Sequence, residues 1–352
     1  MKFLESKKLS LGIFGINASS GIAMVDIPKR WNENWKNISS SIQLVDKIGF
    51  DFVLPIARWK GYGGKTNPTG NCYETISFAA CLTGLTKRIF LFSTVHVPFI
   101  HPVFVARSIS TIDNASGGRI GLNVVCGWSK EEFEMFGKFQ YDKSLRYDHG
   151  KEWITIFKKL LINKKPINFN GKFFNIKGGL CNPKTTKRNC PPIMSAAFSP
   201  DGRSFALKYC DVLFTTFSNN KKALEENKRI LKLSPKIKIF TAVNVFCKPT
   251  SNEANDFYRY CTEEKADHRA VNNFINNLKK SSPIVSKYLK SMKKKVAAGA
   301  GTHSIVGSPK EVVEQIYEIY KSKFSGIAFS FINFNDDLKY FSKTALPKIN
   351  RF

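Results

Sequence analysis

Short apolar runs alternate with amphipathic stretches along most of this chain. The runs lack a regular polar alternation, which is typical of strands that are buried on both faces, as in a parallel sheet. The expected strands are Leu11–Asn17, Phe52–Ala57, Ile89–Val97, Ile120–Cys126, Ile193–Ala197, Val212–Thr215, Ile237–Phe246 and Gly326–Ile332. Helical patterns fall between most of them, at Trp35–Ile48, Cys72–Leu85, Val103–Ala115, Arg146–Leu161, Gly202–Tyr209 and Pro309–Ser322. Strands and helices in this order predict an α/β fold, a (β/α)8 TIM barrel.

Two segments interrupt the alternation. Ile167–Gly178 predicts a small β-hairpin around Asn170-Gly171. Lys248–Ala300 is polar and basic, contains helical stretches, and forms an insertion after the seventh expected strand. A doubly wound sheet is the competing fold, but no glycine fingerprint follows the first strand.

The chain's length and composition fit one large domain. Its 352 residues could form two domains, yet α/β barrels of this size are common, so we expect a single domain over residues 1–352. None of the eight cysteines forms a CxxC pair and the five histidines lack zinc-type spacing, so we expect free thiols and no metal site. No apolar run reaches about 20 residues, and the N-terminus is a poor signal peptide. These features predict a cytoplasmic protein that does not enter a membrane.

The net charge of +28 raises the possibility of a nucleic-acid-binding protein. The lysines are spread along the whole chain, however, and the one dense cluster, Lys287–Lys295, has the pattern of a solvated helix face. We therefore expect no nucleic-acid partner. A basic, non-catalytic nucleic-acid-binding protein stays open as an alternative of another class.

Two nucleotide-binding motifs can be excluded. GGKT at residues 63–66 is not a P-loop, because Trp59 stands where that motif needs glycine. No GxGxxG occurs, which argues against a built-in nicotinamide site. Reducing equivalents would then arrive from another protein.

Residues 117–148 carry the most informative pattern. A turn at Gly117-Gly118 leads into an apolar run that contains Asn123, and Ser129 begins a helical pattern. Together with residues 49–64, 106–125, 191–215 and 301–316, this segment resembles the bacterial-luciferase-like flavin-dependent monooxygenases. Within that superfamily it is most similar to the branch of pyrimidine, dimethylsulfone and alkanesulfonate monooxygenases.

The resemblance implies a two-component FMN-dependent monooxygenase. Reduced FMN would come from a separate NAD(P)H-dependent flavin reductase, and O2 would be the co-substrate. The substrate would be a small organosulfur compound, a sulfone or alkanesulfonate, or a pyrimidine-like heterocycle. The resemblance also implies an insertion that covers the active site, and a homo-oligomer, either a dimer or a tetramer. A deazaflavin (F420)-dependent oxidoreductase of the same fold is the alternative within the superfamily.

The resemblance places Arg146, Tyr147 and Ser199 on the flavin phosphate. Arginine supplies a permanently charged, forked donor, and the other two side chains supply hydroxyls. Ser199-Pro200 also begins a helical pattern, and helix N-termini attract anions. A plain helix cap at Ser199 is compatible with that role.

Four residues are expected around the flavin ring system and ribityl chain, namely Ala57, Arg58, Asn123 and Glu132. Glu132 also completes a Ser129-x-x-Glu132 capping box, which would explain it structurally.

The oxygen and substrate pocket is expected to include Leu54, Trp59, Thr94 and Trp128, and Tyr62 and Phe99 are further candidates for its wall. No acid or base can be identified, and Asn123, His96 and His101 are the catalytic candidates.

Overall fold

Eight parallel strands close into a barrel in the computed structural model, which describes residues 3–5, 8–281 and 292–349. The strands are β1 (Ser10–Phe14), β2 (Phe52–Leu54), β3 (Phe90–His96), β4 (Ile120–Val125), β7 (Ile193–Ala196), β8 (Val212–Phe214), β9 (Lys238–Cys247) and β11 (Gly326–Phe331). Pairing runs in chain order from β1 to β9, then through β11 back to β1. The predicted (β/α)8 barrel is confirmed.

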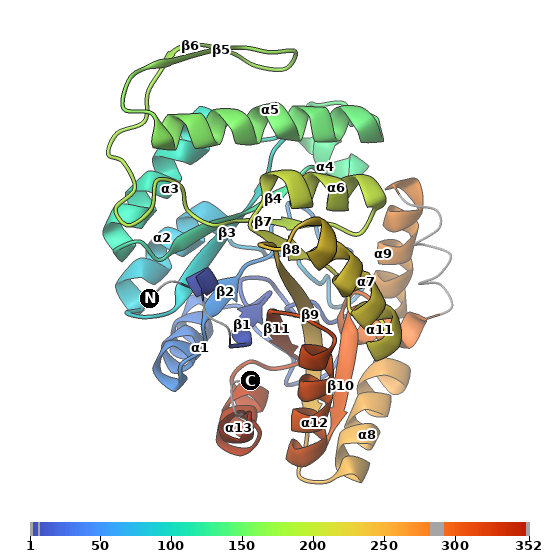
Figure 1. The fold of residues 1–352 in the computed structure, drawn as a ribbon. Coiled ribbons are helices and arrows are strands. Elements are labelled where there is room, and N and C mark those ends of the chain that lie inside the picture. Colours follow the sequence, from blue (N-terminus) through green and yellow to red (C-terminus); the bar gives the residue numbers. More distant parts are fainter. Residues whose placement is uncertain (1–2, 6–7, 282–291, 350–352) are drawn as a thin grey trace.

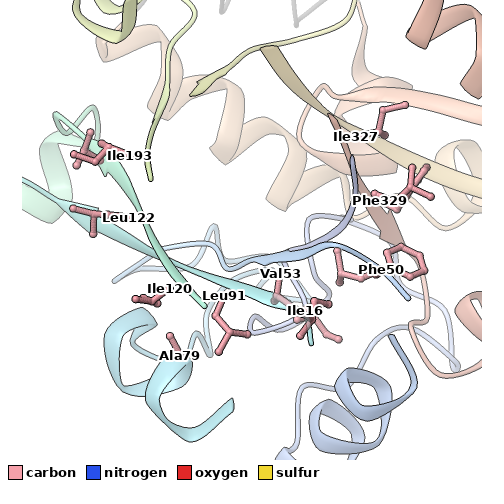
Figure 2. Packing of buried hydrophobic residues seen from close by; sticks show 14 of the residues in the cluster. Ile16, Phe50, Val53, Ala79, Leu91, Ile120, Leu122, Ile193, Ile327 and Phe329 are labelled. Atoms are coloured by element: carbon pink, nitrogen blue, oxygen red, sulfur yellow. The ribbon is translucent and has the colours of Figure 1, made fainter. Parts of the chain in front are cut away.

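Helices surround the barrel on its outer side (Figure 1). They are α1 (Trp35–Ile48), α2 (Thr75–Leu85), α3 (Pro102–Ser116), α5 (Lys143–Ile162), α6 (Pro200–Tyr209), α7 (Asn220–Leu233), α12 (Pro309–Lys321) and α13 (Asp336–Thr344), with short α4 (Lys130–Met135) after β4 and 3-10 turns at Phe3–Glu5 and Leu346–Lys348. The main hydrophobic core lies between strands and helices, where Val53, Leu91 and Ile120 pack beside Ala79 of α2 (Figure 2). This packing fixes the strand ends that carry the site.

Both predicted interruptions are present. The hairpin consists of β5 (Ile167–Asn170) and β6 (Asn175–Gly179), which pair antiparallel. The segment after β9 contains α8 (Ser251–Arg259), a π-helical turn (Tyr260–Glu264), α9 (His268–Ser281) and α11 (Lys293–Gly299). Strand β10 (His303–Gly307) follows and pairs with the carboxyl half of β9. This strand was not predicted from the sequence.

The insertion packs on the loop after β2. The Asp267 carboxylate accepts hydrogen bonds from the Thr66 amide and hydroxyl, at 2.7 and 2.8 Å. Asn273 of α9 donates to the Tyr62 carbonyl oxygen at 2.8 Å. The insertion therefore covers one side of the barrel rim. Of the lysine cluster expected on a solvated helix face, residues 287–291 lie outside the described residues, whereas Lys293 and Lys294 are exposed on α11.

Within the described ranges, no helix is both long and apolar enough to cross a membrane. All eight cysteines are free thiols. Residues 3–5, 8–281 and 292–349 contain no group of three or more histidine, cysteine or acidic side chains able to hold a metal ion.

Aromatic rings fill the base of the barrel and need glycine beside them. A Cβ atom on Gly12 of β1 would lie 2.3 Å from the Phe52 ring, and one on Gly326 would lie 2.7 Å from the Phe240 ring. These two rings themselves pack with their centroids 5.2 Å apart. The two glycines thus leave the space that the Phe52 and Phe240 rings fill within one interior layer of the barrel.

Gly12→Ala should destabilise the barrel, because its methyl group would overlap the buried Phe52 ring. Overpacking of this kind costs about 1–3 kcal/mol, measurable as a lower urea midpoint. Gly84→Ala is the matched control, since a Cβ there meets nothing within 4 Å and the residue lies in α2. We expect the control to be stabilised by up to about 1 kcal/mol. Equal changes in the urea midpoint of the two variants would contradict this account of the barrel interior.

Candidate active site

Polar side chains point into the barrel at the carboxyl ends of β3 and β4. On β3, Leu91 and Val95 face the helices, so alternation turns Thr94 and His96 toward the interior. On β4 the same argument turns Asn123 inward. All three side chains are buried. Leu54 of β2 belongs to the interior cluster below them.

Asn123 is held by one hydrogen bond and has an unused acceptor. Its amide nitrogen donates to the Thr94 hydroxyl at 3.2 Å, and that hydroxyl donates to the Pro55 carbonyl oxygen at 2.6 Å. The amide oxygen of Asn123 is buried and has no hydrogen-bond partner among the described residues. Buried polar atoms are normally paired, so this oxygen is a candidate contact for a ligand.

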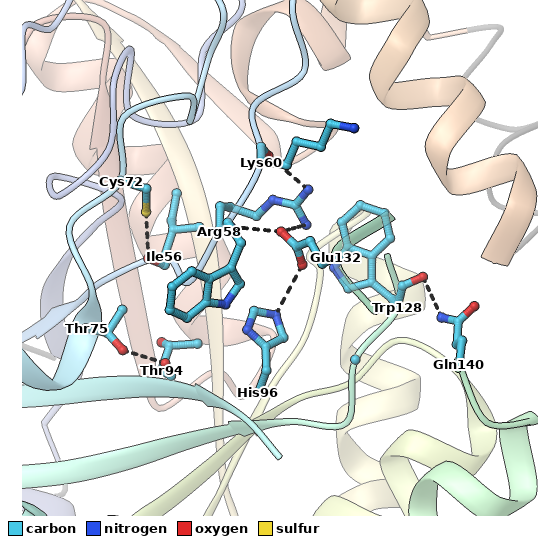
Figure 3. A network of polar contacts seen from close by, with 12 residues as sticks. Ile56, Arg58, Lys60, Cys72, Thr75, Thr94, His96, Trp128, Glu132 and Gln140 are labelled. Atoms are coloured by element: carbon cyan, nitrogen blue, oxygen red, sulfur yellow. Dashed lines mark hydrogen bonds and ion pairs between the residues drawn. The ribbon is translucent and has the colours of Figure 1, made fainter. Parts of the chain in front are cut away.

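Arg58 and Glu132 form a buried ion pair that joins the loop after β2 to α4 (Figure 3). The Arg58 Nη1 atom lies 3.2 Å from Glu132 Oε1, and the two side chains are only 5% and 1% exposed. The same Oε1 accepts a hydrogen bond from the Trp59 amide at 2.9 Å. The guanidinium also lies between two aromatic rings, 5.0 Å from the Tyr62 centroid and 4.8 Å from that of Trp128. The ion pair, the two cation–π contacts and a hydrogen bond from Nη2 to the Lys60 carbonyl oxygen at 3.3 Å hold Arg58.

The capping box predicted at Ser129 and Glu132 is wrong. Ser129 is the N-cap residue of α4, but no side-chain capping bond is made there. The Glu132 carboxylate instead reaches Arg58 and the Trp59 amide, which lie far away in sequence. Burial raises the pKa of Glu132, and Arg58 together with the backbone amides opposes that rise.

His96 faces this pair but does not carry a charge at neutral pH. Burial, with Arg58 adding to it, lowers the pKa of His96 to about 3. The 3.8 Å separation between its Nε2 and Glu132 Oε2 is therefore not an ion pair at pH 7. This pKa argues against the expected titrating role, and it leaves His96 as a neutral hydrogen-bonding group.

An aromatic wall stands beside His96. The His96 ring lies 5.3 Å from Phe99, which stacks on Phe136 at 4.3 Å, and Trp59 contacts Phe136 edge-on at 4.9 Å. The indole nitrogen of Trp59 is buried and has no partner among the described residues. Phe136 was not identified from the sequence, because nothing in the helical pattern of α4 distinguishes it from a packing residue.

Tyr147 and Ser199 meet at the start of α6. The phenol oxygen lies 3.2 Å from the Ser199 hydroxyl, and that hydroxyl also caps α6 by accepting from the Gly202 amide at 3.2 Å. A Cβ on Gly202 would lie 2.7 Å from the Tyr147 oxygen, so glycine is needed here. The segment Ser199-Pro200-Asp201-Gly202 was expected to begin a helix. A role for Gly202 was not predicted from it.

Arg146 lies next to Tyr147 in the first turns of α5. Its Nη1 atom donates to the Gly127 carbonyl oxygen at 2.7 Å, which ties α5 to the loop after β4. Its Nε atom is buried without a partner among the described residues. Burial raises the pKa of Tyr147, and Ser199 and Arg146 oppose the rise. The Tyr147 and Ser199 hydroxyls thus meet at a helix N-terminus, and Arg146, next to Tyr147 in sequence, has a buried N–H without a partner among the described residues; these are donors of the kind that bind a phosphate group.

Two further residues were expected at the site. Ala57 is half-buried between β2 and Arg58 and offers only its backbone. His101 is exposed and caps α3, where its Nδ1 accepts from the Val103 amide at 3.3 Å, and its ring contacts Phe174 next to the hairpin. The structure does not bring His101 into the group around Arg58.

Comparison with known proteins shows the family to which the chain belongs. The luciferase-like monooxygenase family matches residues 13–325. The chain is 26% identical to pyrimidine monooxygenase RutA of Agrobacterium fabrum, over 96% of each chain. It is 30% identical to the RutA of a Bradyrhizobium species over 60% of this chain, and that match spans only 58% of the relative. DmoA from Hyphomicrobium sulfonivorans has a similar structure, with a TM-score of 0.86, 15% identity, and coverage of 97% of this chain and 88% of that one. The chain therefore belongs to the luciferase-like monooxygenase family, a family of flavin-dependent oxygenases.

Proposed function

We propose that this protein is a two-component monooxygenase that uses reduced FMN and O2. The observation that carries the proposal is the convergence of Tyr147, Ser199 and the α6 N-terminus beside Arg146. These groups would hold the FMN phosphate. FMN would enter reduced, supplied by a separate NAD(P)H-dependent flavin reductase, because no nicotinamide-binding motif occurs in the sequence.

Other residues would hold the ring system and ribityl chain. The Ala57 backbone and the ion pair of Arg58 and Glu132 would face the flavin, and the free Asn123 amide oxygen would accept a hydrogen bond from it. When bound, reduced FMN supplies the reaction with O2 that delivers one oxygen atom to the substrate. The aromatic wall of Trp59, Phe99 and Phe136 would keep water from that reaction.

The substrate we propose is a small pyrimidine-like heterocycle or a sulfone or alkanesulfonate. The names of the relatives support the first class. Oxygen uptake should be measured with FMN, NADH and a flavin reductase against a panel of each class. Substrate-dependent uptake with one panel would assign the class, and the absence of uptake with both would contradict the proposal.

Loss of the hydroxyl pair should weaken the binding of FMN but not that of riboflavin. In Tyr147→Phe/Ser199→Ala, we expect the dissociation constant of reduced FMN to rise roughly ten- to hundredfold, because hydrogen bonds to a charged group contribute about 1.5–3 kcal/mol. The dissociation constant of reduced riboflavin, which lacks the phosphate, should stay within about twofold. Anaerobic fluorescence titration measures both.

Ser308→Ala provides the matched control for a lost helix cap. Ser308 precedes Pro309 at the N-terminus of α12, as Ser199 precedes Pro200 at that of α6, and its hydroxyl donates to the Glu311 carboxylate. Its loss should lower stability and leave FMN binding unchanged. Equal affinity of the wild type for FMN and riboflavin would overturn the phosphate assignment. Binding of F420 in place of FMN would favour the deazaflavin alternative, and salt-sensitive binding of nucleic acid without flavin would favour the non-enzymatic one.

We also propose a homo-oligomer, dimer or tetramer, by likeness to the family. Light scattering coupled to size exclusion should give a mass two or four times the 39.8 kDa of one chain. A monomeric mass at micromolar concentration would contradict it.

A further inference from the structure

A second cavity lies between α11, β10 and the loop after β8. Its volume is about 690 Å³, and its walls include Lys293, Lys294, Lys295, His303, Ser218 and Ser304. The elements α11 and β10 lie on the opposite side of the molecule from α2 and α3 (Figure 1). The cavity shares no lining residue with the group formed by Arg146, Tyr147 and Ser199.

The lysines of this cavity are only partly neutralised. Lys294 pairs with Glu263 at 2.6 Å. Among the described residues no carboxylate forms an ion pair with Lys293 or Lys295, and residues 282–291 contain no acidic residue at all. Lys295 is half-buried, and burial lowers its pKa. Lys295 therefore carries a partly desolvated charge for which the described residues supply no carboxylate partner.

Neutral donors surround these charges. Burial, together with Lys295, lowers the pKa of His303 to about 4, so its imidazole is neutral at pH 7 and keeps one N–H donor. Its ring is held edge-on against Phe217 at 4.8 Å. Ser304 of the same strand and Ser218 of the loop after β8 also line the cavity. The described residues that line the cavity therefore carry ammonium, imidazole and hydroxyl groups, and none of these lining residues is acidic.

We propose that this cavity is a second anion site, which binds the phosphate group of a small molecule. Lysine acts on phosphate as a point charge, and hydroxyls and a neutral imidazole complete the shell of donors. A volume of about 690 Å³ lies in the range of small-molecule sites, so an organic residue can accompany the phosphate.

Isothermal titration of the full-length protein with inorganic phosphate, pyrophosphate and glycerol 3-phosphate tests the proposal. Ionic strength is held constant with chloride, because general screening would otherwise imitate binding. We expect saturable binding that weakens about tenfold or more in Lys295→Gln, the loss expected for a charged hydrogen bond. Lys47→Gln is the matched control, because Lys47 is exposed on the distant helix α1 and its loss should change nothing.

The arms of the experiment separate the possible outcomes. Tighter binding of glycerol 3-phosphate than of inorganic phosphate assigns the site to organic phosphates, and the reverse order assigns it to the free ion. Equal weakening in Lys295→Gln and Lys47→Gln would show a nonspecific charge effect and overturn the site. The site would also be overturned if phosphate binding were unchanged in Lys295→Gln but lost in Tyr147→Phe/Ser199→Ala. The anion would then sit at the proposed flavin-phosphate position. Ser304→Ala offers a second variant should Lys295→Gln fail to fold.

Discussion

Replacing Glu132 with alanine should lower the free energy of unfolding by roughly 3–5 kcal/mol, the cost typical of breaking a buried ion pair. The carboxylate is 1% exposed and joins α4 to the loop after β2, which is far away in sequence, through Arg58 and the Trp59 amide. Alanine would leave the Arg58 charge and a buried N–H unpaired and would open a cavity between α4 and the loop after β2. Chemical unfolding monitored by circular dichroism measures the loss.

Glu132→Gln separates the hydrogen bonds from the charge. Its amide oxygen can still accept from the Trp59 amide and lie against the Arg58 guanidinium, so most of the geometry survives. Because burial raises the pKa of Glu132, folding already disfavours the charge that this substitution removes. We therefore expect Glu132→Gln to lose less than half of the stability lost in Glu132→Ala. Equal losses would show that the net charge, rather than the hydrogen bonds, stabilises these loops.

Much of the barrel could be predicted because its strands are continuous apolar runs with helical patterns between most of them. The ends of the strands were less predictable. The first run was expected to reach Asn17, but the strand stops at Phe14, and the Asn17 side chain instead exchanges hydrogen bonds with the Ile56 backbone at 2.8 and 2.9 Å. Likewise β2 ends before Pro55, which has no amide hydrogen to continue the sheet. Such endings depend on neighbours that are distant in sequence.

Elements with little apolar surface were missed. Helix α7 buries only Ala223, Asn227 and Ile230, and its charged remainder hides the helical period. Strand β10 alternates buried and half-buried residues over five positions, too few to be distinguished from a loop. Their place is set by packing against β9 and α12, which no local pattern contains.

The features of the site were likewise only partly predictable from the sequence. Tyr147 and Ser199 were expected to meet, and their hydroxyls lie 3.2 Å apart. Glu132 was read as a local cap, because its real partners are 73 and 74 residues away along the chain. The low pKa of His96 likewise arises from burial and from Arg58, both products of the folded barrel. The types of residue at the site were predictable, and so was the contact between Tyr147 and Ser199. The partners of Glu132 and the protonation state of His96 were not.

Asn123→Leu should separate stability from function. The Asn123 amide oxygen is buried without a partner among the described residues, and such a group costs about 1–3 kcal/mol. Leucine of similar size removes that cost together with one weak hydrogen bond to Thr94, so the free energy of unfolding should stay equal or rise. If the oxygen contacts bound flavin or substrate, turnover should fall roughly ten- to hundredfold, by the same range of hydrogen-bond energies.

Asn227→Leu is the opposite control, because this buried amide donates to the Ser322 carbonyl oxygen at 2.8 Å and lies in α7, outside the barrel rim. It should lose stability and keep its turnover per folded molecule. Unfolding curves and reductase-coupled oxygen uptake on both variants decide the matter. An Asn123→Leu protein that loses as much stability as Asn227→Leu would mean that the amide serves the core. One that keeps full turnover would mean that its free oxygen faces no reacting group. If neither outcome occurs, ligand binding explains why the Asn123 amide oxygen stays unpaired inside the closed barrel.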